Sequence, residues 1–143
     1  MSELSGTLAD DLYYLVCGEE IGRGQYRTVH NTVLNKDWVI KRDTGENYSN
    51  IMEWQIYDEF KDTHIAKWMA PIYYMSPRGL WLVQAKTEPI QRAQMPDKVP
   101  AIFADTKLDN WGMLNGKPVC HDYGNNRLFD LARKPGRKLR KIK

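Results

Sequence analysis

Residues 21–41 read IGRGQYRTVHNTVLNKDWVIK, and this stretch predicts consecutive β-strands joined by tight turns. The first strand covers 12–21, where Tyr, Leu and Val are frequent, and it ends at a Gly-Arg-Gly turn. The second strand covers 28–34 (TVHNTVL), and the third covers 38–41 (WVIK) after an Asn-Lys-Asp turn. Because short turns join antiparallel neighbours, we expect a hairpin that is extended by a third strand.

The next stretch of the chain adds a helix and two further strands. Residues 49–60 (SNIMEWQIYDEF) carry apolar side chains at helical spacing, and Ser49 or Asn50 is suited to cap this helix. Two extended stretches follow, at 65–74 and 80–84. This order predicts an α+β domain, in which a five-stranded antiparallel sheet packs against a single helix.

Beyond the sheet, the sequence predicts little regular structure. Residues 101–129 predict loops and short strands, with a hairpin turn at Gly116-Lys117-Pro118. Residues 88–100 leave room for at most a short helix, because three prolines interrupt them: Pro89, Pro96 and Pro100.

Charge divides the chain into a body and a tail. The 143 residues carry a net charge of +3, but residues 133–143 (RKPGRKLRKIK) hold seven basic residues and no acidic one. The rest of the chain therefore has 14 basic against 18 acidic residues, a net charge of −4. A basic segment with so little to bury predicts disorder. We expect an N-terminal segment 1–11, a domain 12–130 and a disordered tail 131–143.

Composition indicates a soluble protein, with 42% hydrophobic and 27% charged residues. No apolar run approaches the ~20 residues of a membrane span, and the acidic N-terminus MSELSGTLADD lacks the features of a secretory signal. We therefore expect a cytoplasmic protein with no membrane partner. Cys17 and Cys120 are far apart in sequence. Two free thiols are the expectation in a reducing compartment, and a disulfide between them is the alternative.

Two motifs in the predicted strands carry groups suited to phosphate binding. Gly22-Arg23-Gly24 lets the backbone approach phosphate oxygens closely. Val39-Ile40-Lys41 ends a strand, on which Val39 and Lys41 share a face. Taken alone, a G-x-G hairpin is more often an ordinary turn, and a lysine at the end of an apolar strand is more often a surface residue.

Two further motifs lie in the second half of the chain. The segment DTKLDN at 105–110 places a carboxylate, an ammonium and an amide at its first, third and sixth positions. Asp122-Tyr123-Gly124 follows the predicted hairpin, so Asn110 and Asp122 are expected on adjacent strand ends. Oxygen ligands of this kind suit Mg²⁺, which takes one or two of them together with phosphates and waters.

Taken in order, these motifs and an acidic helical residue, Glu53, resemble the protein kinase superfamily. The likeness covers residues 12–124 and involves the patterns G-x-G-x-x-G-x-V, V-A-I-K, D-x-K-x-x-N and D-F-G. Three departures stand out: Arg27 replaces the third glycine, Phe103-Ala104 replaces a His-Arg pair, and Tyr123 replaces Phe. Arg27 is expected either to stiffen the loop or to place a cation near the phosphates.

The resemblance implies ATP and Mg²⁺ as cofactors and a role for each motif residue. Lys41 would contact the phosphates and pair with Glu53, for which Glu46 is the alternative. Asp105 would orient or accept the proton of the attacking hydroxyl, and Lys107 would neutralise the γ-phosphate. The implied metal ligands are Asn110 and Asp122, and the implied nucleotide-binding residues are Gly22, Gly24, Tyr26, Val29, Lys41, Gln84 and Lys86.

The resemblance leaves two functions open. One is a minimal phosphotransferase of the serine/threonine type that acts on a protein target. The other is a catalytically silent kinase-like protein that inhibits or sequesters a partner. Retention of the charged motif residues favours the first, whereas the short C-terminal part favours the second, because only 19 residues follow Gly124.

Three further readings accompany these two. Some kinase-like sites transfer a nucleotidyl group instead of a phosphoryl group, and this is another possible reaction. A compact chain of this kind also resembles bacteriophage-encoded proteins that modify or inhibit host machinery, which would place it in the host cytoplasm. The basic tail predicts salt-dependent attraction to nucleic acid as a weaker alternative.

Overall fold

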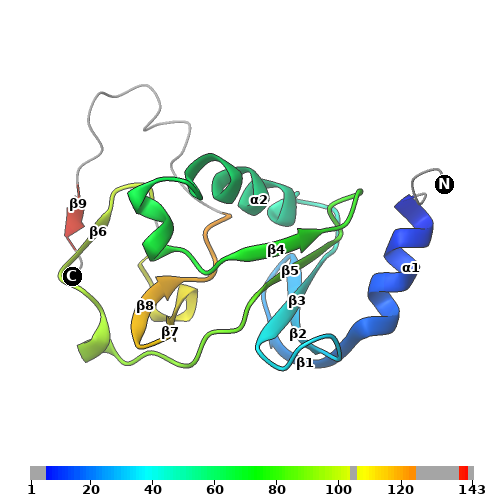
Figure 1. Cartoon of the computed structure of the whole chain (residues 1–143), viewed down its shortest axis with the longest axis horizontal. Helices are drawn as coiled ribbons and strands as arrows, with labels where there is room; N and C mark the ends of the chain where they lie inside the picture. Colours follow the sequence, from blue (N-terminus) through cyan, green and yellow to red (C-terminus); the bar gives the residue numbers. More distant parts are fainter. Residues whose placement is uncertain (1–5, 104–105, 125–138, 142–143) are drawn as a thin grey trace.

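The computed structural model describes residues 6–103, 106–124 and 139–141. Figure 1 shows α1 and the large sheet at one end of the molecule and the short strands β6 to β9 at the other. Within the described residues the elements are α1 (Gly6–Val16), β1 (Cys17–Arg23), β2 (Arg27–Thr32), β3 (Trp38–Asp43), α2 (Ser49–Phe60), η1 (His64–Trp68), β4 (Ile72–Met75), β5 (Trp81–Ala85), η2 (Arg92–Gln94), β6 (Lys98–Pro100), η3 (Leu108–Asn110), β7 (Trp111–Leu114), β8 (Lys117–Cys120) and β9 (Leu139–Lys141).

Strands β1 to β5 form one antiparallel sheet in the order β1-β2-β3-β5-β4. The predicted α+β class and five-stranded antiparallel sheet are thereby confirmed. Val29 lies opposite Lys41, and Lys41 lies opposite Leu82. Since opposed residues point to the same side of a sheet, these three side chains share one face. Thr28 and Arg42, also opposed, share the other face.

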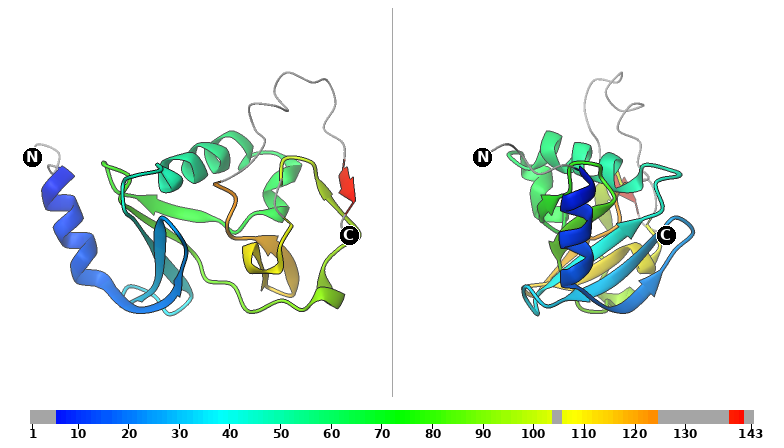
Figure 2. Two further views of the ribbon diagram at one scale, coloured as in Figure 1. Left: turned by 180° about the vertical axis from the view of Figure 1, so that it is seen from behind. Right: turned by 90° about the vertical axis from the view of Figure 1, so that its right-hand side faces the viewer.

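Each face of the sheet is covered by a helix. Ile56 and Phe60 of α2 join the core cluster that contains Leu82 of β5. Tyr13 and Val16 of α1 pack on the opposite side, against the cluster that contains Trp81. In the left view of Figure 2, α1 stands on the far side of strands β1 to β3 from α2. The domain is therefore a sheet between two helices, one more helix than the sequence predicts.

The prediction of a strand over 12–21 is wrong in its first half, because residues up to Val16 belong to α1 and β1 begins at Cys17. The frequent Tyr, Leu and Val residues favour a strand locally. However, Tyr13 and Val16 are three positions apart and pack on one side of a helix, with the Tyr13 ring stacked 6.5 Å from that of Trp81. Tertiary burial has overridden local propensity here.

The predicted extended stretch 65–74 is also wrong in its first part, where η1 occupies His64–Trp68 and β4 starts only at Ile72. The hydroxyl of Thr63 donates to the Phe60 carbonyl oxygen at 2.7 Å and accepts from the Ile65 backbone N–H at 3.2 Å. These bonds turn the chain directly after α2 and bury Ile65 in the core.

The β7–β8 hairpin is present, with its turn one residue earlier than predicted. Asn115 and Gly116 form the turn with φ angles of 52° and 78°. Positive φ at both positions matches the twist of the flanking strands, and Asn-Gly is the favoured pair. Lys117 and Pro118, expected in the turn, belong to β8.

Part of the expected disordered tail is ordered. Residues 139–141 form β9, which pairs antiparallel with β6. The rest of the segment 131–143 lies outside the described residues. Both cysteines are free thiols, as expected from the sequence. Cys120 is buried and Cys17 is half-buried.

Candidate functional site

A cleft of about 820 Å³ opens between the β1–β2 hairpin, strands β3 and β5, and the turns that flank β7 and β8. It brings together residues that are up to 100 positions apart in the sequence. Its lining includes every residue expected to bind a nucleotide and both expected metal ligands: Gly22, Gly24, Tyr26, Val29, Lys41, Gln84, Lys86, Asn110 and Asp122.

Lys41 and Glu53 form a buried ion pair beside this cleft. Lys41 points from β3 toward the side of the sheet that α2 covers, and Glu53 lies on the buried face of α2. The Lys41 Nζ donates to Glu53 Oε1 at 2.6 Å, and the exposed fractions of the two side chains are 4% and 0%. The same ammonium donates to the backbone oxygen of His121. Lys41 is thereby held between the helix and the end of β8.

Glu53 also fixes the segment Asp122-Tyr123-Gly124. Its Oε2 accepts the backbone N–H of Tyr123 at 2.9 Å and that of Gly124 at 2.8 Å. Only glycine fits at position 124, because a Cβ there would lie 2.9 Å from the carbonyl oxygen of Ser49. The glutamate therefore ties the lysine strand, the helix and this tripeptide to one point.

Arg27 enters the same cluster from the start of β2. Its guanidinium donates to both Glu53 oxygens, at 3.1 and 3.3 Å, and to Oδ1 of Asp122 at 2.7 Å. It donates to Oδ1 of Asn50 as well, at 3.1 Å. These contacts are consistent with both expectations for Arg27. They hold the β1–β2 loop in place, and they put a cation near the expected phosphate site.

The electrostatics of the cluster keep Glu53 ionised. Burial alone would raise its pKa, but Arg27 and Lys41 more than offset burial and bring the pKa to about 2. Burial raises the cost of charge on Lys41 as well, so its pKa is lowered, with Glu53 opposing that effect. The pKa of Arg27 is raised because Glu53 and Asp122 together outweigh its burial.

The start of α2 is built around the cluster in a way that the sequence does not reveal. Neither Ser49 nor Asn50 caps the helix, which follows Tyr48 in a left-handed conformation. Instead, the carboxylate of Asp43 at the end of β3 accepts the Asn50 backbone N–H at 2.8 Å. This leaves the Asn50 side chain free to bridge Arg27 and the Lys41 carbonyl oxygen.

His121 is held as a neutral ring at the mouth of the cleft. Its Nε2 lies 2.7 Å from the carbonyl oxygen of Asp109, which can only accept, so Nε2 carries the proton. Its Nδ1 then accepts from the Thr87 hydroxyl at 2.7 Å. Burial, followed by the nearby Lys41, lowers the pKa of His121. The ring thereby connects the β5 exit to the turn that presents Asn110.

Asn110 and Asp122 sit as expected at neighbouring chain ends, since the His121 N–H donates to the Asn110 carbonyl at 2.9 Å. Among the described residues, no group of three or more His, Cys, Asp or Glu side chains is arranged to hold a metal. An amide and a carboxylate nevertheless fit Mg²⁺, which completes its shell with phosphates and waters. The Asp122 side chain is 44% exposed, so it opens to the cleft despite its bond to Arg27.

Two other predicted contact residues have structural partners. Gln84 is fully buried, and its amide donates to the Ala70 carbonyl and to the Tyr123 hydroxyl. Lys86 donates to Oδ1 of Asn31 at 3.0 Å. Both lie in the cleft wall.

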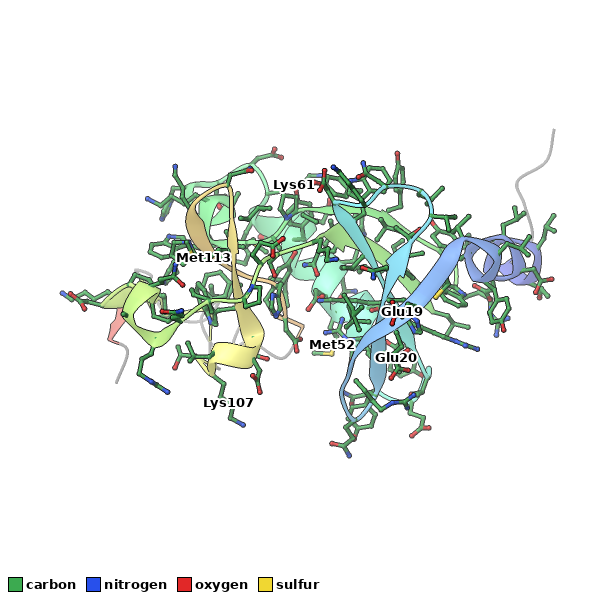
Figure 3. The ribbon with its side chains drawn as sticks, turned by 90° about the horizontal axis from the view of Figure 1, so that it is seen from below. Glu19, Glu20, Met52, Lys61, Lys107 and Met113 are labelled. Carbon is green, nitrogen blue, oxygen red and sulfur yellow. The ribbon has the colours of Figure 1, made fainter. Side chains whose placement is uncertain are left out.

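The segment DTKLDN at 105–110 is only partly brought to the cleft, through Asp109 and Asn110. Lys107 is exposed and lies outside the cleft lining, and Figure 3 shows its side chain pointing outward from the turn that leads into η3. Asp105 lies outside the described residues. Glu46, the alternative partner of Lys41, is exposed in the loop before α2, and Glu53 holds that place.

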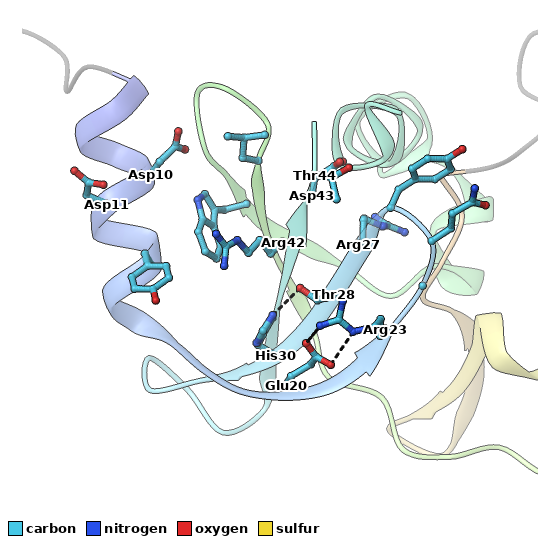
Figure 4. A pocket seen from close by; sticks show the side chains of 16 residues that line it. Asp10, Asp11, Glu20, Arg23, Arg27, Thr28, His30, Arg42, Asp43 and Thr44 are labelled. Carbon is cyan, nitrogen blue, oxygen red and sulfur yellow. Dashed lines mark hydrogen bonds and ion pairs between the residues drawn. The ribbon is translucent and has the colours of Figure 1, made fainter. Parts of the chain in front are cut away.

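A second cavity of about 580 Å³ lies between α1 and the other face of strands β1 to β3. In Figure 4, Arg23 pairs with Glu20 at 2.7 Å and His30 contacts Thr28, whereas Asp10 and Asp11 stand apart on α1. Arg42 lies over the ring of Trp81. With both signs of charge present, this lining favours no class of ligand.

The chain has no match among protein families, curated proteins or solved structures. No helix within the described residues has the length and apolar character to cross a membrane. Any functional assignment therefore has to come from the chemistry of the cleft itself.

Proposed function

We propose that this chain is a minimal kinase-like phosphotransferase that binds ATP with Mg²⁺ and acts on a serine or threonine of a protein target. The single observation that supports it best is convergence. Lys41, Asn110 and Asp122 come from separate parts of the sequence and line one cleft together with Gly22, at the end of β1, and Gly24, in the turn after it. The volume of about 820 Å³ lies in the range usual for small-molecule sites.

The cleft offers a distinct place for each part of a nucleotide. Val29 and Val39 supply an apolar surface for a base near the β5 exit. The turn between β1 and β2 begins at Gly24, whose N–H donates to the Arg27 carbonyl oxygen at 2.8 Å, and this turn would lie close to the phosphates. An ammonium has three donors, and Lys41 uses two of them on Glu53 and His121, so one is left for a phosphate.

The remaining roles follow from the resemblance. Bound Mg²⁺, held by Asn110 and Asp122, would offset charge on the phosphates. The oxygen of the substrate hydroxyl would bond to the γ-phosphorus as ADP leaves, and Asp105 would accept the proton of that hydroxyl. Lys107, which the resemblance assigns to the γ-phosphate, is exposed outside the cleft lining and would have to turn inward to reach it. Catalysis of this kind is mainly positioning and charge neutralisation, which a small rigid scaffold can provide.

A second function, a silent kinase-like binding protein, is favoured by one observation. Arg27 already occupies Oδ1 of Asp122, the carboxylate assigned to the metal. Because Arg27 neutralises this carboxylate, Asp122 is less available to bind a metal ion, and a site without bound metal is less suited to phosphoryl transfer. The two functions separate on phosphoryl transfer, not on nucleotide binding.

The proposal is tested by thermal unfolding with ATP and Mg²⁺, followed by transfer of labelled γ-phosphate. ATP at 100 times its Kd should stabilise the fold by about 2.7 kcal/mol, and Lys41→Met should remove that stabilisation. Arg42→Gln, on the other face of β3, is the matched control and should retain it. Label should appear on a protein acceptor and vanish in Asp105→Ala. ATP binding without transfer would favour the silent protein, and no ATP stabilisation would refute the phosphotransferase.

A further inference from the structure

The most unusual feature of the cleft is the arginine at its base. Arg27 stands where the resembled pattern has glycine, yet it does not extend into solvent. Only 11% of its side chain is exposed, and its guanidinium reaches three side chains: Asn50, Glu53 and Asp122. So many charge-assisted bonds define a fixed position.

Arg27 also balances the charge of the cluster. Two carboxylates, Glu53 and Asp122, face two cations, Lys41 and Arg27. Without Arg27, two carboxylates would face a single ammonium. The uncompensated charge would then fall on Asp122, the carboxylate that opens to the cleft, where it would repel the phosphates of a nucleotide.

A divalent ion bound between a carboxylate and a triphosphate reduces this repulsion. Arg27 does so from within the protein, 2.7 Å from Asp122. Its position does not depend on a ligand, because Glu53 holds the same guanidinium through both oxygens. A cation fixed in advance costs little further ordering when a ligand binds.

We propose that Arg27 is a resident counter-cation of Asp122, which lets this cleft bind nucleotide with only weak dependence on divalent metal. This inference rests on the proposed function, since it presupposes that the cleft binds ATP. It also specifies the regulation of the site, because nucleotide would stay bound when free Mg²⁺ falls.

The competing explanation is that Arg27 is only a clamp. In that case it ties the β1–β2 hairpin to α2 through Asn50 and Glu53, and its loss weakens binding equally with and without metal. A counter-cation instead changes the ratio of the two affinities. The ratio of ATP Kd in EDTA to ATP Kd in Mg²⁺ therefore separates the two explanations and cancels general effects of folding.

The experiment measures this ratio by calorimetry for the full chain and four variants. The unmodified protein should show a ratio within about tenfold. Arg27→Gln should raise the ratio by about tenfold or more, because Asp122 then needs the metal. Arg27→Lys keeps a cation and should stay near the unmodified ratio. Arg42→Gln, which removes one charge from the far face of the sheet, should change nothing. Asp122→Asn removes the repulsion and should bring the ratio close to one.

Each outcome has one meaning. Strict Mg²⁺ dependence in the unmodified protein would overturn the inference and leave the proposed function standing. The inference would also fail if Arg27→Gln bound ATP with an unchanged ratio, since Arg27 would then be a clamp. Should Arg27→Gln not fold, the unmodified protein and Asp122→Asn still decide. Absence of ATP binding under both conditions would instead refute the proposed function itself.

Discussion

Glu53→Gln is the substitution that tests the cluster most directly. Glutamine has the same shape as glutamate, but its NH₂ group takes the place of one carboxylate oxygen. In either orientation of the amide, this NH₂ group would face hydrogen-bond donors. Oε1 accepts from Lys41 and Arg27, and Oε2 accepts from two backbone N–H groups, so neither oxygen can be exchanged without loss. Removing one partner of a buried ion pair costs about 3–5 kcal/mol.

The pKa of Glu53 gives a separate estimate of the same magnitude. A carboxyl whose pKa falls from 4.5 to about 2 on folding stabilises the native state by about 3 kcal/mol. Because the folded pKa is the lower one, this stability is present above pH 4.5 and is lost as the pH falls toward 2. Glu53→Gln should therefore weaken the fold at pH 7 and flatten its acid dependence.

The assay is urea unfolding between pH 2 and 7, with Glu59→Gln as the matched control. Glu59 lies on the same helix but is exposed, so its substitution should stay within about 0.5 kcal/mol. Glu53→Gln should lose about 3 kcal/mol at pH 7, which corresponds to roughly 10 °C in Tm. If Glu53→Gln matched the control, or kept the full acid dependence, the account of the cluster would be wrong.

Three further predictions concern the tripeptide after β8 and the thiols. Gly124→Ala should cost about 1–3 kcal/mol in urea unfolding, because its Cβ would press on a backbone carbonyl 2.9 Å away; an unchanged midpoint would contradict this packing. Tyr123→Phe should cost about 1 kcal/mol through the lost bond to the Ala70 carbonyl, with nucleotide affinity kept. Burial raises the pKa of Cys120, so mass spectrometry after native thiol labelling should find the label on Cys17 and reach Cys120 only on unfolding.

The parts of the fold that the sequence predicts are those with local causes. The five-stranded sheet follows from alternating apolar runs and turn residues, and α2 has its predicted bounds of 49–60. Helix α1 was not predictable in this way, since its second half has Tyr and Val residues that favour a strand, and Trp81, on which Tyr13 stacks, is 68 positions away. Long-range packing decides such a segment, and one sequence does not display it.

The residues of the candidate site also fall into those that could be predicted from local sequence and those that could not. Motif order places Lys41, Asn110 and Asp122 together, because each lies in or next to a predictable element, although β3 runs two residues past Lys41 to Asp43. The partners of Arg27 were not predictable, since Asp122 lies 95 positions away and nothing local to Arg27 points to it. The one available signal was the replacement of a glycine by a long cationic side chain, which indicates that the loop has a different task.

The buried face of α2 explains how so short a chain can hold a cleft. Its first half buries polar residues, Asn50 and Glu53, and its second half buries Ile56 and Phe60. Hydrophobic burial in the second half fixes the helix on the sheet, and that fixed position lets four donors converge on Glu53. Buried charge is costly unless every partner is in place, so the cluster forms only in the native arrangement. The same interactions that order the hairpin, β3 and the end of β8 therefore also shape the site.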